Sequence, residues 1–394
     1  MNQRFGREFL GTPGPTNVPD NVLSAMHRPA TDIYSGPLVE MTDSCLDDLK
    51  KIFRTEGQTY IYISNGHGSW ESALTNVLSR GEKVLVLPSG GFANRWGEMA
   101  DFLGLETEAL DWDWRRAVNP DEVEARLRRD KSGEIKAILV VQVDTASGVV
   151  NDIPKIRAAI DNAGHGALLL VDAIASLGTM PFEMDEWGVD VAVTGSQKGL
   201  MMPPGLSFVA AGRRAMEAHR KADMRTRYWD WTARHGSLHY EKYCGTPPVN
   251  QLFGLRAALD MILEEGLDEA IRRHRLLAEA SRQAVKVWSK EGVLEFNILD
   301  PRERSNSVTV VLMGGNHDSE MLLDYCNQKG DVVLGIGILG LKNKAFRIAH
   351  MGHVNAPMML GTLSVIEMGL VALNIPHGRG GVGAAIEYLG KQVS

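Results

Sequence analysis

Short apolar segments alternate with amphipathic segments through the first half of the chain, and this pattern predicts repeated strand–helix units. The apolar segments are nearly continuous and end at turns that contain glycine or polar residues. Such runs are typical of strands that are covered on both faces. We therefore predict an α/β fold with a mainly parallel sheet and helices on both of its faces. Strands are expected at residues 60–63, 83–87, 137–142, 168–172, 189–194 and 208–210.

Amphipathic periodicity predicts the helices of this part at residues 20–26, 38–54, 70–78, 119–129 and 152–162, with a turn and helix over 90–103. The pattern then changes, with two long helices expected at 249–265 and 268–290. Strands near 307–312 and 346–350 follow, with helices near 318–329 and 357–373. These elements predict a small α+β domain. The expected division is an N-terminal arm over 1–19, a large domain over 20–265 and a small C-terminal domain over 266–394.

The composition is that of an ordinary globular protein. The chain has 394 residues, of which 44% are hydrophobic and 23% charged, and its formal net charge is -7. This balance does not favour nucleic acid or an anionic membrane as a partner. Without a signal-peptide pattern or a long apolar run, the expected location is cytoplasmic. Cys45, Cys244 and Cys326 form no CxxC pair, so neither a disulfide framework nor a metal site is indicated.

The most informative chemistry is an aspartate followed by a lysine. Asp172 closes the apolar run Leu168–Val171, and Lys198 lies in a turn after the next predicted strand. Open α/β sheets bind ligands at the carboxyl ends of their strands. A desolvated lysine can form a Schiff base, and an aspartate can keep a pyridine nitrogen protonated. The pair therefore indicates pyridoxal phosphate (PLP) chemistry, with a surface lysine as the alternative.

A phosphate site is expected where a strand turns into a helix. Asn65, Gly66 and His67 occupy this turn, so backbone N–H groups at the helix N-terminus would face an anion. Ser196 and Gln197 offer further donors from the opposite side. A plain strand–helix turn is the alternative, and His67 either caps the helix or contacts the cofactor.

Three further residues fit a flat cofactor and a carboxylate substrate. Phe92 follows a strand end, so its ring either stacks on the cofactor or belongs to the core. Ile174 lies two residues beyond Asp172 and therefore on the same side of the extended chain. Arg347 lies inside an apolar strand, where either a bidentate carboxylate ligand or a structural salt bridge would satisfy it.

Six motifs together resemble the class V, fold-type I PLP-dependent aminotransferases, in particular the alanine/serine–glyoxylate group. The motifs are PGPTNVP, GHGSWESAL, VDAIASLG, GSQKGLMMPPGLSFV, YCGTPPV and FRIAHMG. The lysine turn with its spaced aspartate is the most specific of them. The resemblance covers nearly the full chain and implies a seven-stranded-type sheet, PLP as cofactor, no metal, and a homodimer with shared active sites.

The resemblance also implies roles for individual residues. Lys198 would hold PLP as a Schiff base and shuttle a proton, and Asp172 would pair with the pyridine nitrogen. Phe92 would stack on the ring, Thr145 would bind near the ring hydroxyl, and Arg347 would bind the substrate carboxylate with backbone near Gly14. The phosphate contacts would come from Asn65, Gly66, His67 and Gln197 of one subunit and from Tyr243 and Thr246 of its neighbour.

Two segments depart from the family pattern. Tyr34 lies in Asp-Ile-Tyr-Ser, where serine–glyoxylate members usually have Asp-His-Arg-Ser. Asp144 lies in Val-Asp-Thr-Ala-Ser-Gly, where they usually have Asn-Glu-Thr-Ala-Thr-Gly. We expect both residues to alter the amino-donor pocket. The second segment is similar to pyridoxamine–pyruvate aminotransferase, although the phosphate-binding residues favour bound PLP.

The expected function is a ping-pong transamination from a small amino acid, such as serine or alanine, to a small 2-oxoacid. Glyoxylate is the first choice of acceptor and pyruvate the second. One alternative is a pyridoxamine–pyruvate-type aminotransferase. A second is a PLP-dependent lyase of the cysteine-desulfurase type, which needs a cysteine on a mobile loop, whereas Cys326 is predicted in a helix. The third is a cofactor-free α/β binding protein.

Overall fold

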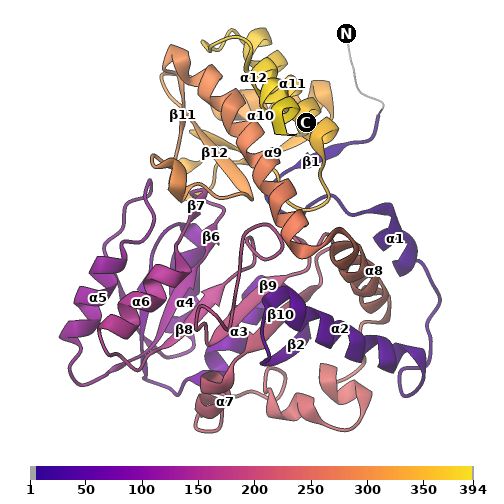
Figure 1. Ribbon diagram of the computed structural model, residues 1–394, viewed down its shortest axis with the longest axis vertical. Helices are drawn as coiled ribbons and strands as arrows, with labels where there is room; N and C mark the ends of the chain where they lie inside the picture. Colours follow the sequence, from indigo (N-terminus) through magenta and orange to yellow (C-terminus); the bar gives the residue numbers. More distant parts are fainter. Residues whose placement is uncertain (1–5, 393–394) are drawn as a thin grey trace.

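The computed structural model describes residues 6–392, so the first five residues of the predicted arm and the last two of the C-terminal domain lie outside it. The chain builds a seven-stranded sheet, a five-stranded sheet and a two-stranded ribbon. In Figure 1 the five-stranded sheet and its helices lie above the larger sheet. Within the described residues no helix is both long and apolar enough to cross a membrane.

The larger sheet has the strand order β2-β10-β9-β8-β5-β3-β4. Neighbours from β9 to β4 are parallel, and β10 is antiparallel to both β2 and β9. The predicted mainly parallel sheet is thereby confirmed. Its strands are β2 (Gln58–Ile63), β3 (Lys83–Leu87), β4 (Glu106–Ala109), β5 (Ile135–Val141), β8 (Leu168–Asp172), β9 (Val191–Gly195) and β10 (Leu206–Ala211).

Helices cover both faces of this sheet, as predicted. On β3, Leu85 and Leu87 join a core cluster with α2, α5, α6 and α8. The alternate residues Val84 and Val86 join a second cluster with α3 and α4. The helices of this part are α1 (Asp20–Met26), α2 (Pro37–Phe53), α3 (Gly66–Val77), α4 (Gly91–Phe102), α5 (Pro120–Arg129), α6 (Ile153–Asn162), α7 (Arg213–His219) and α8 (Val249–Glu265).

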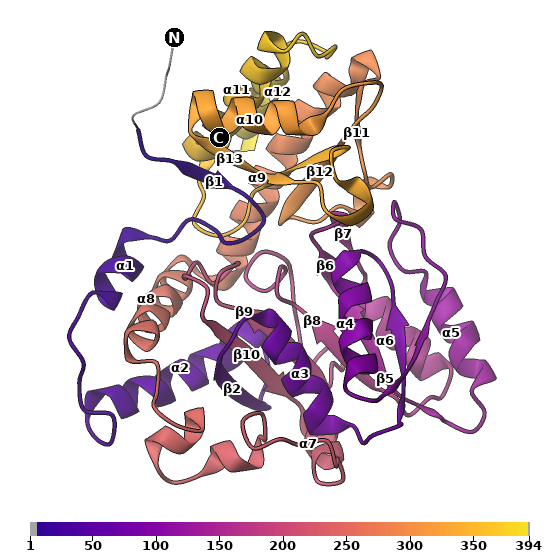
Figure 2. The same cartoon turned by 180° about the vertical axis from the view of Figure 1, so that it is seen from behind.

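The smaller sheet has the order β1-β13-β14-β12-β11. Its first strand, β1, belongs to the N-terminal arm. Phe9 to Gly11 pair in parallel with Val332 to Leu334 of β13, and Figure 2 shows β1 beside β13. The strands are β1 (Phe9–Gly11), β11 (Leu294–Phe296), β12 (Val308–Met313), β13 (Val332–Ile336) and β14 (Ala345–Ala349). The helices are α9 (Leu267–Trp288), α10 (Ser319–Gly330), α11 (Ala356–Ala372) and α12 (Gly381–Gln392).

Shorter elements connect these parts. A two-stranded ribbon pairs β6 (Val143–Asp144) with β7 (Val149–Val150). Short 3-10 segments occur at Thr232–His235, His239–Tyr243, Ser289–Glu291, Pro301–Glu303 and Leu339–Leu341.

Helix α3 begins four residues earlier than predicted. The side chain of Asn65 accepts a hydrogen bond from the backbone N–H of His67 at 3.1 Å, so Asn65 is the N-cap. A polar N-cap satisfies one of the first backbone donors of a helix. Gly66 and His67 therefore lie in the first helical turn, beside the carboxyl edge of the sheet.

Candidate active site

Asp172 is the last residue of β8 and lies at the carboxyl edge of the larger sheet. Its side chain is buried, and each oxygen accepts one hydrogen bond. Oδ1 accepts from the backbone N–H of Ile174 at 2.6 Å, and Oδ2 accepts from Nε1 of Trp70 at 2.8 Å. Burial nevertheless raises the pKa of Asp172 to about 7. The carboxyl group is thus held in one orientation and is available to a cationic partner.

Lys198 lies in the turn after β9, beneath the N-terminal arm. Its Nζ donates to the carbonyl oxygen of Pro13, and its own carbonyl accepts from Oγ1 of Thr16 at 3.2 Å. The intervening Gly14 has a φ of +121°, and a Cβ there would overlap the lysine side chain. Burial and the nearby charge of Arg347 lower the pKa of Lys198 to about 8. A neutral amine is therefore accessible near neutral pH.

Arg347 is a buried residue of β14, 8% exposed. Two backbone carbonyls hold its guanidinium: Nε donates to Ile336 at 2.6 Å and Nη1 donates to Thr145 at 3.0 Å. Across residues 6–392 no ion pair involves Arg347, so the alternative of a structural salt bridge does not hold there. Burial lowers its pKa to about 10, against the opposing charge of Asp144. A buried guanidinium without a carboxylate partner is a site for an anionic ligand.

The N-terminus of α3 lies beside Ile174, two residues after Asp172. Gly66 packs so closely on Ile174 that a Cβ at residue 66 would overlap the isoleucine side chain. Asn65 and His67 are exposed, and the imidazole of His67 lies 4.5 Å from the ring of Trp70. Helix α3 also packs against β9, which precedes Gln197. The structure thus places the predicted phosphate turn next to the strand ends that carry Asp172 and Lys198.

Gln197, Phe92 and Thr145 are the other residues expected at the cofactor. Oε1 of Gln197 is buried and has no hydrogen-bond partner in the described part of the chain. Phe92 is partly buried, and its ring centroid lies 6.4 Å from that of Trp70. Thr145 is buried and turns its carbonyl toward Arg347. All three lie around the predicted cofactor position.

Asp144 occupies a different place from the one expected. It is fully buried, and its Oδ2 accepts from the backbone N–H groups of Phe92 at 2.8 Å and Ala93 at 3.1 Å. Oδ1 accepts from Ala146 at 2.9 Å. A Cβ at Gly90 would overlap this carboxylate. Asp144 therefore caps the start of α4 instead of facing an amino-donor pocket.

The remaining predicted site residues are Tyr243, Tyr34 and Thr246. Tyr243 is 2% exposed, and within this chain its hydroxyl pairs with Oγ1 of Thr42 at 3.0 Å. Tyr34 is 72% exposed and packs edge-on against Tyr240 at 6.3 Å. Thr246 is exposed. Tyr34 and Thr246 are therefore surface residues of this chain.

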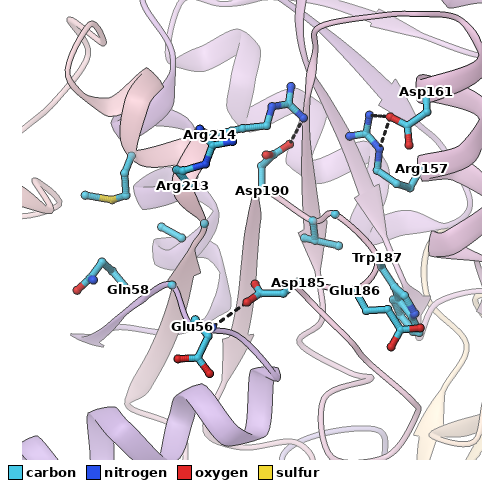
Figure 3. Close-up of a pocket in the computed structure, with 16 residues that line it drawn as sticks. Glu56, Gln58, Arg157, Asp161, Asp185, Glu186, Trp187, Asp190, Arg213 and Arg214 are labelled. Carbon is cyan, nitrogen blue, oxygen red and sulfur yellow. Dashed lines mark hydrogen bonds and ion pairs between the residues drawn. The ribbon is translucent and has the colours of Figure 1, made fainter.

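An open cavity of about 670 Å³ lies at the opposite edge of the larger sheet, next to the amino ends of β8 and β9 (Figure 3). Four of the charged side chains that line it form two ion pairs. Nη1 of Arg214 lies 3.2 Å from Oδ2 of Asp190, and Arg157 pairs with Asp161 within α6. The buried Asp190 of this cavity thus has a cationic partner, unlike the buried Arg347 near Lys198.

Two contacts of the site were not anticipated from the sequence. Trp70 belongs to the GHGSW motif, but its bond to Asp172 depends on α3 lying across the end of β8. Pro13 and Thr16 belong to the PGPTNVP motif, and they reach Lys198 because β1 anchors the arm to the smaller sheet. The motifs marked these residues, whereas only the fold shows what they contact.

Comparison with known proteins gives a consistent result. Residues 9–338 match the family described as aminotransferase class-V. The chain is 39% identical to a serine–glyoxylate aminotransferase of Methylorubrum extorquens, covering 98% of this chain and 97% of that protein. It is 37% identical to an L-aspartate–glyoxylate aminotransferase of Paracoccus denitrificans, covering 95% and 94%. The solved structure of pyridoxamine–pyruvate aminotransferase from Mesorhizobium loti superimposes with a TM-score of 0.90 at 25% identity, covering both chains completely.

Proposed function

The chain belongs to the class V aminotransferase family, and we propose that it is a PLP-dependent transaminase that moves an amino group from a small amino acid to glyoxylate. One observation carries the proposal. A lysine of lowered pKa, a buried aspartate and a buried arginine that forms no ion pair within residues 6–392 meet at the carboxyl edge of the larger sheet. This arrangement offers a nucleophilic amine, an anion and a carboxylate-binding cation to one small ligand.

The residues present fit the proposed cofactor. Lys198 offers the amine, Asp172 the anion for the pyridine nitrogen, and Phe92 a ring of suitable size for stacking. The α3 N-terminus beginning at Gly66 offers backbone donors and the positive end of a helix dipole for the phosphate. When bound, PLP supplies a carbonyl and an electron-withdrawing ring that stabilises negative charge at the substrate Cα.

The protein then supplies binding, orientation and proton transfer. Arg347 binds the substrate α-carboxylate through a planar guanidinium, which favours a bidentate geometry. Lys198 accepts and returns a proton, because burial keeps its pKa near 8. Gly14 leaves room for that side chain, and Pro13 fixes its resting position. Asp172 keeps the pyridine nitrogen protonated.

The choice of glyoxylate rests on the relatives that act on it by name, at 39% and 37% identity over nearly the full chain. These two relatives differ in amino donor, so the donor is left as a small amino acid such as serine or alanine. The pyridoxamine–pyruvate alternative has weaker support, at 25% identity. We also propose a homodimer, in which the exposed Tyr34 and Thr246 would reach the partner's site.

Two of the three cysteines, Cys326 and Cys45, are unsuited to the lyase alternative. Cys326 lies in α10 as predicted, it is fully buried, and burial raises its pKa to about 12. Cys45 is buried in the same way, with its pKa raised to about 12. Buried thiols of high pKa are poor nucleophiles.

The experiment is a panel of amino acids assayed with glyoxylate and with pyruvate, alongside a test for sulfide release from cysteine. We expect turnover with glyoxylate and a small donor, and no sulfide. Lys198→Ala serves as the inactive reference. Sulfide release without transamination, or a purified protein that binds no PLP, would overturn the proposal. Sedimentation of the holoenzyme tests the homodimer.

A further inference from the structure

The indole of Trp70 contacts the one carboxylate that the proposed cofactor depends on. Nε1 donates to Oδ2 of Asp172 at 2.8 Å, and the two residues are 1% and 3% exposed. We propose that Trp70 is a positioning residue that keeps Asp172 ionised and correctly oriented opposite the pyridine nitrogen. This inference rests on the proposed PLP chemistry and assigns a new role within it.

The orientation argument comes from the two donors on Asp172. Ile174 N–H holds Oδ1 at 2.6 Å and Trp70 holds Oδ2, so rotation of the carboxyl group would break a hydrogen bond. A carboxylate has about four lone-pair sites, and two remain for another donor. Trp70 is itself confined between the imidazole of His67 at 4.5 Å and the ring of Phe92 at 6.4 Å. The indole therefore fixes the plane of the carboxylate.

The ionisation argument comes from the surroundings of Asp172. The nearby charged groups are Lys198, which favours the anion, and Asp144, which opposes it. Burial disfavours the anion, and the Trp70 and Ile174 donors favour it. Of the two hydrogen-bond donors to Asp172, Trp70 is the one that donates from a side chain, and its indole is uncharged at any ordinary pH. Its loss would leave the anion with one backbone donor in a buried position.

The test compares two buried tryptophans of the same core. Trp70→Phe removes the donor and keeps an aromatic ring. Trp231→Phe is the matched control, because Trp231 is also fully buried in this core, stacks on Tyr60 and has an Nε1 without a hydrogen-bond partner among the described residues. We expect Trp70→Phe to raise the PLP dissociation constant and lower kcat by roughly 10-fold or more, since hydrogen bonds to charged groups are among the stronger ones. KM should change less than about 2-fold, and Trp231→Phe should match the wild type in all three quantities.

A double-mutant cycle shows whether Trp70 acts through Asp172. In an Asp172→Asn background, Trp70→Phe should change the PLP dissociation constant by less than about 2-fold. The apo-protein gives a second readout without cofactor: Trp70→Phe should move the pH-dependent loss of stability caused by Asp172 to higher pH. Equal effects of Trp70→Phe in both backgrounds, or an unchanged apo-protein pH profile, would overturn the role of Trp70. Loss of turnover in Lys198→Ala would in that case leave the proposed function standing.

Discussion

Both edges of the seven-stranded sheet carry buried charged groups, but only one edge pairs them. At the amino edge, Asp190 lies 3.2 Å from Arg214 and also accepts from the backbone of Leu169 at 2.8 Å. At the carboxyl edge, Asp172 is held by uncharged N–H groups, and Arg347, which β14 of the smaller sheet brings to this edge, is held by backbone carbonyls. The same sheet thus neutralises charge within the chain at one edge and keeps it for a ligand at the other.

The difference shows how to separate a structural charge from a functional one. A buried ion pair within the chain needs no ligand, and removing one partner leaves a costly unpaired charge. A buried ionisable group without an opposite charge, and with a perturbed pKa, is a candidate for binding or catalysis. Substitutions at the carboxyl edge should therefore change turnover, whereas those at the amino edge should change stability alone.

The largest expected effect comes from Lys198→Ala. Positioned proton transfer typically contributes roughly 10²–10⁴ in rate, and this residue would also form the covalent link to PLP. We expect kcat to fall by at least this range, measured with glyoxylate and the best donor of the panel. Lys155→Ala, which changes an exposed lysine of α6, is the control and should retain wild-type turnover. If Lys198→Ala kept wild-type transamination, the charged groups at the carboxyl edge would not be the catalytic ones.

The next effect concerns the stability of the apo-protein. Burial raises the pKa of Asp172 to about 7 from an ordinary value of 3.8. A raised carboxyl pKa means that the stability it contributes is fully present below about pH 4 and is lost as the pH rises through 7. The wild type should lose on the order of 2–4 kcal/mol relative to Asp172→Asn between pH 4 and 7.5. Urea unfolding across this pH range measures the difference. If the free energies of unfolding of the two proteins vary with pH in the same way, the Asp172 carboxyl does not have the raised pKa that burial predicts.

A smaller effect is expected from Arg347→Lys. An ammonium cannot reproduce two parallel hydrogen bonds to a carboxylate. KM for the amino acid and for the oxoacid should rise roughly 10-fold to 100-fold, in line with about 1.5–3 kcal/mol for a hydrogen bond to a charged group. Steady-state kinetics with both substrates measure this, and PLP affinity serves as the control that should remain unchanged. An unaltered KM would place Arg347 outside the substrate site.

The smallest effect is expected from Arg214→Gln at the amino edge. This change leaves Asp190, whose side chain is 5% exposed, with a backbone donor but no charged partner. The free energy of unfolding should fall by about 1–3 kcal/mol, as estimated for an unsatisfied buried group. Neither kcat nor KM should change by more than about 2-fold. A change in KM comparable to that of Arg347→Lys would mean that both edges bind the substrate.

Much of the fold could be predicted because hydrophobic periodicity is a local property. The expected bounds of α1, β3 and α8 agree with the structure. The elements that were not predicted depend on distant partners. β1 has three residues and becomes a strand by pairing with β13, more than 300 residues later. β4 is a half-exposed edge strand, Glu106–Ala109, without an apolar pattern.

The site could be predicted only where a motif determines the chemistry. The spacing of Asp172 and Lys198 indicated two strand ends at one edge, and the structure brings them together. The orientation of Asp144 depends on the close approach of Gly90 and the free amides at the start of α4. The burial of Tyr243 depends on its bond to Thr42 in α2. A sequence motif contains neither of these contacts.

The pairing of β1 with β13 also has a consequence for biosynthesis. Pro13 and Thr16 cover Lys198 from an arm whose strand needs Val332 to Leu334 as its neighbour. A ribosome delivers the arm first and β13 only after some 320 further residues. A nascent chain therefore carries Lys198 without its cover until Val332, 134 residues further on, has been made. The reactive amine acquires its final surroundings only when the first and last thirds of the polypeptide meet.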